Sequence, residues 1–144
     1  MATPHVRWPL FEARHFDLAT RFAQWASANL KPYEADEGGD GKAARAIFAA
    51  LGRDGWLRST STSDGQGAVL DLRGVCLLRE ICGQSSAMAD VALSEPWLGA
   101  LPLMLGASVE LKRKYLPGYF AGRLLPAFAL SEPEAGSDAR AITT

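Results

Sequence analysis

The chain has 144 residues, of which 48% are apolar and 22% are charged, and its net charge at pH 7 is -1. Such a composition is typical of one globular domain with a core of its own, and the near-neutral charge argues against a nucleic-acid partner. The N-terminal residues lack the apolar core of a signal peptide, and no stretch approaches the roughly 20 apolar residues of a membrane span. We therefore expect a cytoplasmic protein without a membrane span.

Two amphipathic helices are predicted in the first third of the chain. Large apolar residues recur at spacings of 7, 4 and 3, which places them on one helical face: Phe11, Leu18, Phe22 and Trp25. Pro32 disfavours helical geometry at the residue before it, so this helix should end near Leu30. After a polar, glycine-rich turn, a second helix rich in alanine is expected from Lys42 to Arg53. Trp56 and Leu57 should then pack back on the core.

Residues 58–67 are polar and contain glycine, and we expect a surface loop there rather than a domain boundary. Residues 68–83 are apolar nearly all round, which predicts a largely buried helix. Cys76 and Cys82 lie six residues apart, and so on roughly opposite faces of that helix, which argues against a disulfide between them. Their spacing does not fit a zinc motif either. We expect two reduced core thiols and no metal site.

The second half of the chain predicts two more helices and then a strand. Residues 87–105 have helical propensity, and Ser94-Glu95-Pro96 resembles a helix restart with Ser94 as its cap. Ser108 is expected to cap a further helix over 109–116. Residues 124–130 are short, apolar and followed by turn residues, which is typical of a strand, the first in the chain. Because a lone strand leaves its backbone groups unsatisfied, it should pair with another chain or with a sheet formed beyond residue 144.

The segment from Phe128 to Asp138 has the features of a turn that binds an anion or a cofactor. It places short polar side chains directly after an apolar run, at Ser131 and Ser137. Gly136 allows the backbone to come close to a ligand and to point successive N–H groups at phosphate oxygens. Ser, Pro, Gly and Asp are also what ordinary turns are made of, so the residue types alone favour a plain loop over a binding turn.

An ordered pattern from Gly106 to Asp138 resembles the acyl-CoA dehydrogenase family. In that family a helix ending in Lys-x-x-Tyr-Leu-Pro precedes a strand and a [Phe/Tyr]-Ala-[Leu/Val]-[Thr/Ser]-Glu-Pro-x-Ala-Gly-Ser-Asp signature. The first part is matched by Lys112, Tyr115, Leu116 and Pro117, and the second by Phe128, Leu130, Ser131, Glu132, Pro133, Ala135, Gly136, Ser137 and Asp138. Upstream the resemblance is looser but continues to about Leu10, and it departs from the family at residues 58–67.

The resemblance implies a mostly α fold. Residues 1–123 would form the family's N-terminal bundle of five to six helices, and residues 124–144 would begin a middle β-domain that is incomplete in this chain. It further implies FAD as cofactor and an acyl-CoA thioester as substrate.

Specific residues acquire implied roles in the same way. The main chain at Phe128 and Leu130, with the Ser131 hydroxyl, would lie against the pyrimidine side of the flavin. Gly136 and Ser137 would approach the flavin pyrophosphate, and Ser137 would also touch the CoA thioester arm. Three helical residues would line the acyl-chain pocket, with plain helix packing as the alternative: Val91, Ser94 and Leu98.

The implied chemistry is α,β-desaturation, in which a carboxylate removes the α proton while the β hydrogen leaves as hydride to the flavin. The family's catalytic glutamate lies in a C-terminal helical domain, beyond Thr144, so we assign no catalytic residue in this chain. Glu132 is expected to brace the turn instead. For the whole enzyme the resemblance implies a homotetramer that passes electrons to an electron-transfer flavoprotein or an equivalent acceptor.

Three interpretations follow. The chain is the N-terminal part of such an enzyme, a short subunit completed by a partner chain, or a non-catalytic helical interaction module. Acyl-CoA oxidases and flavin monooxygenases of the same fold are alternatives within the enzyme interpretation. On its own, the chain is expected neither to hold FAD stoichiometrically nor to turn over acyl-CoA.

Overall fold

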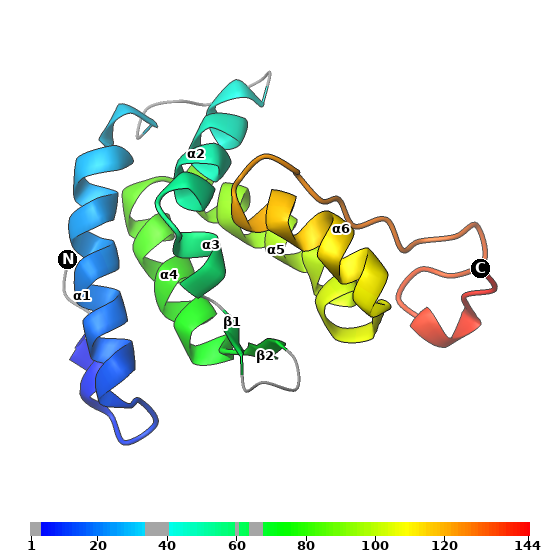
Figure 1. Cartoon of the computed structure of the whole chain (residues 1–144), viewed down its shortest axis with the longest axis horizontal. Helices are drawn as coiled ribbons and strands as arrows, with labels where there is room; N and C mark the ends of the chain where they lie inside the picture. The colour runs from blue at the N-terminus through cyan, green and yellow to red at the C-terminus, as the bar shows by residue number, and fades with distance from the viewer. Residues whose placement is uncertain (1–3, 34–40, 60, 64–67) are drawn as a thin grey trace.

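The computed structural model describes residues 4–33, 41–59, 61–63 and 68–144 of the chain (Figure 1). Within these ranges the α-helices are α1 (Ala13–Asn29), α2 (Lys42–Arg53), α3 (Trp56–Ser59), α4 (Leu72–Ser85), α5 (Ala87–Gly106) and α6 (Val109–Phe120). Two short strands, β1 (Ser61–Ser63) and β2 (Ala68–Leu70), and the 3-10 turns η1 (Pro4–Arg7), η2 (Lys31–Tyr33) and η3 (Ala139–Ala141) complete the list. The mostly α fold is confirmed. None of the helices described is long and apolar enough to cross a membrane.

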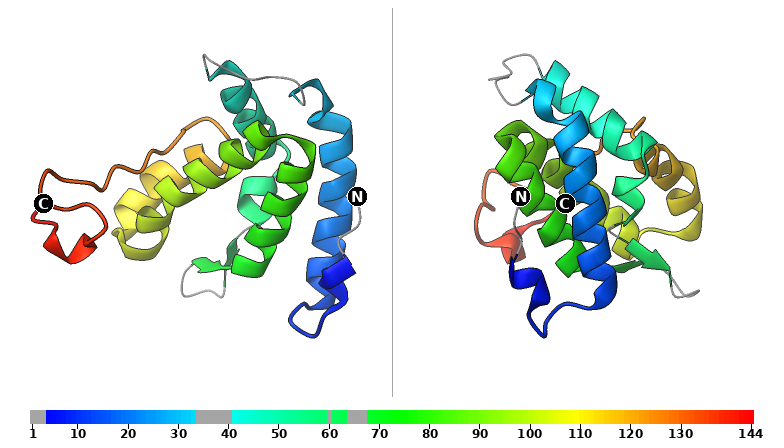
Figure 2. Two further views of the ribbon diagram at one scale, coloured as in Figure 1. Left: turned by 180° about the vertical axis from the view of Figure 1, so that it is seen from behind. Right: turned by 90° about the vertical axis from the view of Figure 1, so that its left-hand side faces the viewer.

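The helices pack in a chain of neighbours that differs from their sequence order. α1 lies along α4, α4 along α5, and α5 contacts both α2 and α6, as Figures 1 and 2 show from three sides. α5 is therefore the central helix, with neighbours on several faces. This explains its composition, because a helix that is apolar all round is stable in water only when most of it is covered.

The predictions for α1 and α2 are confirmed by the apolar faces they bury. Phe22 of α1 is fully buried, and it packs edge-on against Trp56 with the ring centroids 4.9 Å apart. α2 runs from Lys42 to Arg53, as the alanine-rich pattern predicted. Trp56 and Leu57 do return to the core, with 8% and 0% of their surface exposed.

The segment predicted as a loop followed directly by a helix contains a hairpin instead. β1 and β2 pair antiparallel in the register Ser61 with Leu70 and Ser63 with Ala68. The pairing satisfies the backbone N–H and C=O groups of both strands. The polar residues of β1 gave no reason to expect a strand there. The helix then begins two residues after β2, because the carboxylate of Asp71 caps it by accepting from the Gly74 N–H at 3.2 Å. The loop residues 64–67 lie outside the described ranges.

The two cysteines lie on different faces of α4, as predicted, but only one of them is in the core. Cys82 is fully buried and Cys76 is exposed, and both are free thiols. Burial raises the pKa of Cys82 to about 12. The expectation of two core thiols is therefore wrong for Cys76, because α4 is packed on one side only at that position.

α5 is one continuous helix of 20 residues, which corrects the predicted restart at Ser94. Pro96 lies in its interior rather than in a first turn. A proline there removes a helical hydrogen bond and costs about 3 kcal/mol. The packing of α5 against α4 and α2 offsets that loss, since Pro96 is itself buried. At the next helix the Ser108 cap is confirmed: its hydroxyl accepts from the Leu111 N–H at 3.3 Å, and α6 continues through Pro117 to Phe120.

Residues 124–130 do not form the predicted strand in the described structure. They are extended, and no backbone–backbone hydrogen bond of residues 125–131 joins them to any other described residue. The physical reason is that an unpaired strand leaves its backbone N–H and C=O groups unsatisfied. A strand exists only with a partner, and none of the described segments pairs with this one.

Candidate functional site

The extended segment after α6 is seated on two glycines. A Cβ built on Gly99 of α5 would lie 3.0 Å from backbone atoms of Pro126 and Ala127, and one built on Gly118 of α6 would lie 3.1 Å from the Leu124 Cβ. Both helices therefore let the segment run directly against their backbone. As a result, α5 lies side by side with Pro126 and Ala127, directly before the segment from Phe128 to Asp138 that carries the family signature.

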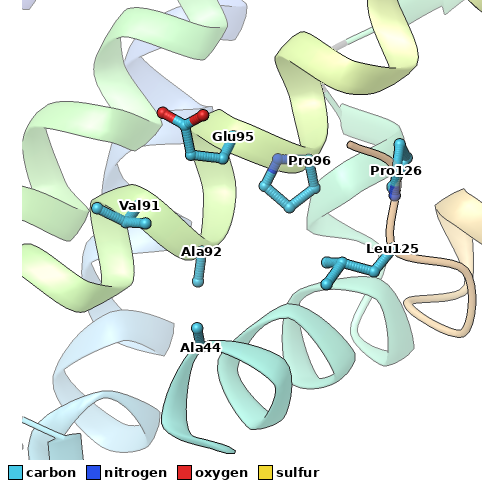
Figure 3. Close-up of a pocket in the computed structure, with 7 residues that line it drawn as sticks. All are labelled: Ala44, Val91, Ala92, Glu95, Pro96, Leu125 and Pro126. Atoms are coloured by element: carbon cyan, nitrogen blue, oxygen red, sulfur yellow. The ribbon is translucent and has the colours of Figure 1, made fainter. Parts of the chain in front are cut away.

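A pocket of about 190 Å³ opens where this segment crosses α5. Figure 3 shows Ala44 of α2 and Ala92 of α5 facing each other across it, with Leu125 and Pro126 on the side opposite Val91. The lining is almost wholly apolar and comes from three parts of the chain: Ala44, Val91, Ala92, Glu95, Pro96, Leu125 and Pro126. Such a pocket suits an aliphatic group better than a charged one.

Of the three residues predicted for an acyl-chain pocket, Val91 lines this pocket, whereas Ser94 and Leu98 do not. Val91 is 47% exposed and Leu98 is 37% exposed, and Ser94 is half-buried. Leu98 precedes Gly99, so it stands beside the point where the segment crosses α5. Two large apolar side chains left open on the central helix favour a surface that something else covers.

The residues predicted to contact a cofactor are all exposed. Phe128 and Leu130 expose 43% and 44% of their surface, and Ser131, Gly136 and Ser137 are also exposed. A Cβ added at Gly136 would meet no atom within 4 Å, so the space beside that backbone is open. The main chain of Phe128 and Leu130 has no backbone partner within the described ranges. These groups are free to bind a ligand or a neighbouring strand.

The carboxylates of the signature segment are occupied by the loop itself. Glu132 accepts hydrogen bonds from Thr143 and Thr144, each at 3.0 Å. Hydrogen bonding to Thr144 and Thr143 lowers the pKa of Glu132 to about 2, and the Thr144 side chain contributes most. Asp138 caps η3 by accepting from the Arg140 N–H at 3.1 Å. The bracing role predicted for Glu132 matches these contacts. A pKa of about 2 makes Glu132 a poor general base, because a general base works best with a pKa near the operating pH.

No group of three or more potential metal ligands (His, Cys, Asp or Glu) comes together in the residues that the structure describes. The polar clusters that do occur connect one element of the fold to another. One of them ties α1 to α4 through the buried pair His15 and Asp71, whose Nε2 and Oδ1 atoms lie 3.1 Å apart. This network is remote in sequence from the signature segment, and we assign it to stability.

Residues 12–123 match the sequence profile of the acyl-CoA dehydrogenase N-terminal domain. A probable acyl-CoA dehydrogenase of Mycobacterium leprae, fadE25, is 31% identical over 143 residues, which covers 94% of this chain and 36% of the relative. A 3-(aryl)acrylate reductase of Clostridium sporogenes is 28% identical over 137 residues, with the same two coverages. A cyclohex-1-ene-1-carbonyl-CoA dehydrogenase of Geobacter metallireducens is 39% identical over 103 residues, covering 70% of this chain and 26% of the relative.

The fold is thus a helical domain whose central helix and trailing segment leave an apolar face and a glycine-containing loop exposed. With the match over residues 12–123, the chain belongs to the acyl-CoA dehydrogenase family. It spans about a third of the length of the first two relatives, 36% in each case.

Several residues of this region had no individual signal in the sequence. Leu125, Pro126 and Ala44 line the pocket only because the segment folds back over α5 and α2. In the sequence nothing distinguishes Gly99 from any other glycine within a helix. Its role becomes clear only from the structure, where the backbone of Pro126 and Ala127 crosses it. None of these four positions is a matched residue of the family pattern, and the contacts between them join residues that are far apart in the chain.

Proposed function

We propose that residues 1–144 form the N-terminal part of an FAD-dependent acyl-CoA dehydrogenase, which converts an acyl-CoA thioester to its α,β-unsaturated form. In this proposal residues 1–123 are its N-terminal helical domain and residues 124–144 begin its middle β-domain. The observation that carries the proposal is the signature segment from Phe128 to Asp138. The residues of this segment that would contact a cofactor are exposed, and within the described ranges the main chain at Phe128 and Leu130 has no backbone partner.

The residues present fit one edge of a flavin. Unpaired main-chain N–H and C=O groups at Phe128 and Leu130 supply the donor and acceptor pattern that the edge of a pyrimidine ring requires. The Ser131 hydroxyl adds a third polar group. The open backbone at Gly136 and the exposed Ser137 suit a pyrophosphate, whose oxygens take backbone N–H and hydroxyl donors.

FAD, when bound, would supply the hydride acceptor for the β hydrogen of the substrate. The role of this chain is to bind and orient. Val91 and Leu98, with Ser94 between them, would offer α5 as one wall for the acyl chain and keep water from it. Ser137 would hold the thioester arm against the cofactor. Removal of the α proton is assigned to a carboxylate outside residues 1–144.

Further properties of the proposed whole enzyme follow from the family. They are a cytoplasmic location, a homotetramer, and an electron-transfer flavoprotein or equivalent acceptor. The Clostridium sporogenes relative is named as a reductase, whereas the other two are named as dehydrogenases. Activity assays should therefore be run in both directions, with saturated thioesters and an acceptor, and with unsaturated substrates and a donor.

A purified chain of residues 1–144 is expected to be colourless and to show no acyl-CoA-dependent reduction of a dye. The reason is that its flavin-facing residues form a single exposed edge, and one edge of a site does not retain a cofactor through purification. The measurement is the flavin absorbance per mole of protein, together with the dye assay.

The matched sample is the polypeptide encoded by the complete reading frame that contains codon 144. It is expected to be yellow and to reduce the dye when an acyl-CoA is added. Stoichiometric flavin in the 144-residue chain would contradict the first expectation. A complete polypeptide that binds no flavin would refute the proposed function.

A further inference from the structure

The most heavily bonded carboxylate in the C-terminal part of the chain belongs to Glu132. Its Oε2 atom accepts from both the Thr143 N–H and the Thr143 hydroxyl, and its Oε1 atom accepts from the Thr144 N–H, each at 3.0 Å. All three donors lie more than ten positions further along the chain. One side chain therefore closes residues 132–144 into a loop.

The same residue also fixes the start of that loop through its backbone. The Glu132 N–H donates to the Ala135 carbonyl at 2.9 Å, and the Ala135 N–H donates back to the Glu132 carbonyl at 3.1 Å. Ala135 is 1% exposed although its neighbours Glu134 and Gly136 are exposed. Glu132 thus takes part in both the tight turn and the carboxylate bonds. Gly136 and Ser137 come directly after this doubly bonded turn.

The helical body offers this loop little other support. Figures 1 and 2 show residues 131–144 extending beyond α5 and α6, clear of α1 and α4. The conformation of Gly136 and Ser137 therefore depends on bonds within the loop. Hydrogen bonds to an ionised carboxylate are the strong members of their class, and three on one group give a geometry that neutral turn residues would not hold alone.

We propose that Glu132 is the positioning residue of the flavin loop: its carboxylate holds residues 132–144 closed, so that Gly136 and Ser137 are presented to the flavin pyrophosphate in their bound conformation. This inference rests on the proposed function, which supplies the flavin. Glu132 is not a catalytic residue, because its oxygens face Thr143 and Thr144. Pre-organisation of this kind raises affinity by lowering the ordering cost that binding would otherwise carry.

The test compares Glu132→Gln with Glu134→Gln. The first substitution keeps the shape of the side chain and removes its charge, and it places an amide group where an acceptor is needed. The second makes the same change at an exposed carboxylate, Glu134, for which no such bonds are found among the described residues. Thr143→Val is a milder second variant, since it removes the hydroxyl donor and leaves both backbone donors in place.

Two quantities are measured. In the 144-residue chain, Glu132→Gln is expected to speed hydrogen exchange at the Thr143 and Thr144 amides about tenfold, with no change in the melting temperature of the helical body. In the polypeptide from the complete reading frame, it is expected to weaken FAD binding by about tenfold, measured by fluorescence titration. Thr143→Val should change both in the same direction by a smaller factor, and Glu134→Gln should change neither.

The outcomes separate the inference from the proposed function. Unchanged amide exchange in Glu132→Gln would overturn the closed loop. Faster exchange with wild-type FAD affinity would overturn the positioning role, since a merely structural bond would move the first quantity and not the second. Absence of FAD binding in the wild-type complete polypeptide would refute the proposed function, and the exchange data would still decide whether Glu132 closes the loop.

Discussion

Replacing Gly52 by alanine is expected to destabilise the helical domain by at least about 4 kcal/mol, which is enough to unfold many domains of this size. Gly52 lies on the buried face of α2, where the turn after α6 crosses it. A Cβ at this position would overlap the backbone N and Cα of Gly122 and lie 2.5 Å from the Ala121 carbonyl carbon. These are backbone atoms, so no side-chain rotation relieves the overlap.

The crossing is also constrained from the other side, which makes relaxation difficult. Gly122 has a φ of +68°, in the left-handed region that favours glycine, and its own Cβ would lie 2.8 Å from the Phe48 carbonyl oxygen. The Gly122 N–H closes the end of α6 by donating to Tyr119 at 2.8 Å. To admit a methyl group at Gly52, the α6 turn would have to leave α2 altogether.

Gly83→Ala is the matched control for this prediction. It makes the same substitution within a helix, at an exposed position of α4 where an added Cβ meets nothing within 4 Å. There alanine should be neutral or stabilise the fold by about 0.5–1 kcal/mol, through helix propensity alone. The measurement is urea unfolding of both variants followed by circular dichroism. A Gly52→Ala protein as stable as the wild type would show that the α2–α6 crossing is looser than described.

How much of this structure the sequence predicts depends on how local the cause is. α2 was predicted to its observed limits, because its apolar stripe and the glycine before it act within a few residues. The Ser108 cap was predicted for the same reason. The close approach of Gly52 to Gly122 was not predictable, since it joins residues 70 positions apart and neither has a neighbour that marks it.

The errors also have physical causes. The hairpin was missed for two reasons. The serine and threonine of β1 resemble a loop, and the apolar residues of β2 were assigned to the helix that follows; only their pairing makes both segments strands. Pro96 was taken for a helix start because a proline costs least in the first turn, yet tertiary packing holds it inside α5. The strand predicted over 124–130 failed for lack of a partner, although its extended course was correct.

The candidate site was predicted in a different way. The residue types of 128–138 alone favoured a plain loop, and an ordered family signature was needed to assign a cofactor to this segment. Neither the residue types nor the family signature indicated the pocket residues Leu125 and Pro126 or the close contact at Gly99. These depend on where the segment after α6 crosses α5. The roles assigned to Phe128, Leu130, Ser131, Gly136 and Ser137 stay predictions until flavin binding is measured.

Replacing Asp71 by alanine is expected to destabilise the domain by about 3 kcal/mol, because it leaves buried donors without partners. Asp71 Oδ1 accepts from Gly74 and from the fully buried His15, and Oδ2 accepts from Arg14 at 2.5 Å. The Glu12 N–H donates to His15 Nδ1 at 2.9 Å, so Nε2 is the ring nitrogen that carries a proton, and it faces Asp71. Without the carboxylate, that proton has no acceptor in the core.

The pH dependence of this contribution follows from the sign of the Asp71 pKa shift. Burial by itself would raise the pKa, but hydrogen bonds from Gly74 and His15 and the charge of Arg14 together lower it below the ordinary value of 3.8. Because the pKa of Asp71 is lower in the folded state than in the unfolded state, its contribution to stability is complete at pH values above the unfolded-state pKa. It is lost as the pH falls below about 4. The stability difference between wild type and Asp71→Ala should therefore be constant from neutral pH to about 5 and shrink in more acidic solution.

The control is Asp17→Ala, which removes a carboxylate of α1 from an exposed ion pair. Asp17 and Arg21 lie 2.8 Å apart with side chains 64% and 60% exposed, so its loss should cost less than about 0.5 kcal/mol. Chemical unfolding at several pH values measures both variants. If Asp71→Ala costs no more than Asp17→Ala, then His15 and Gly74 find other acceptors, and the network does not tie α1 to α4.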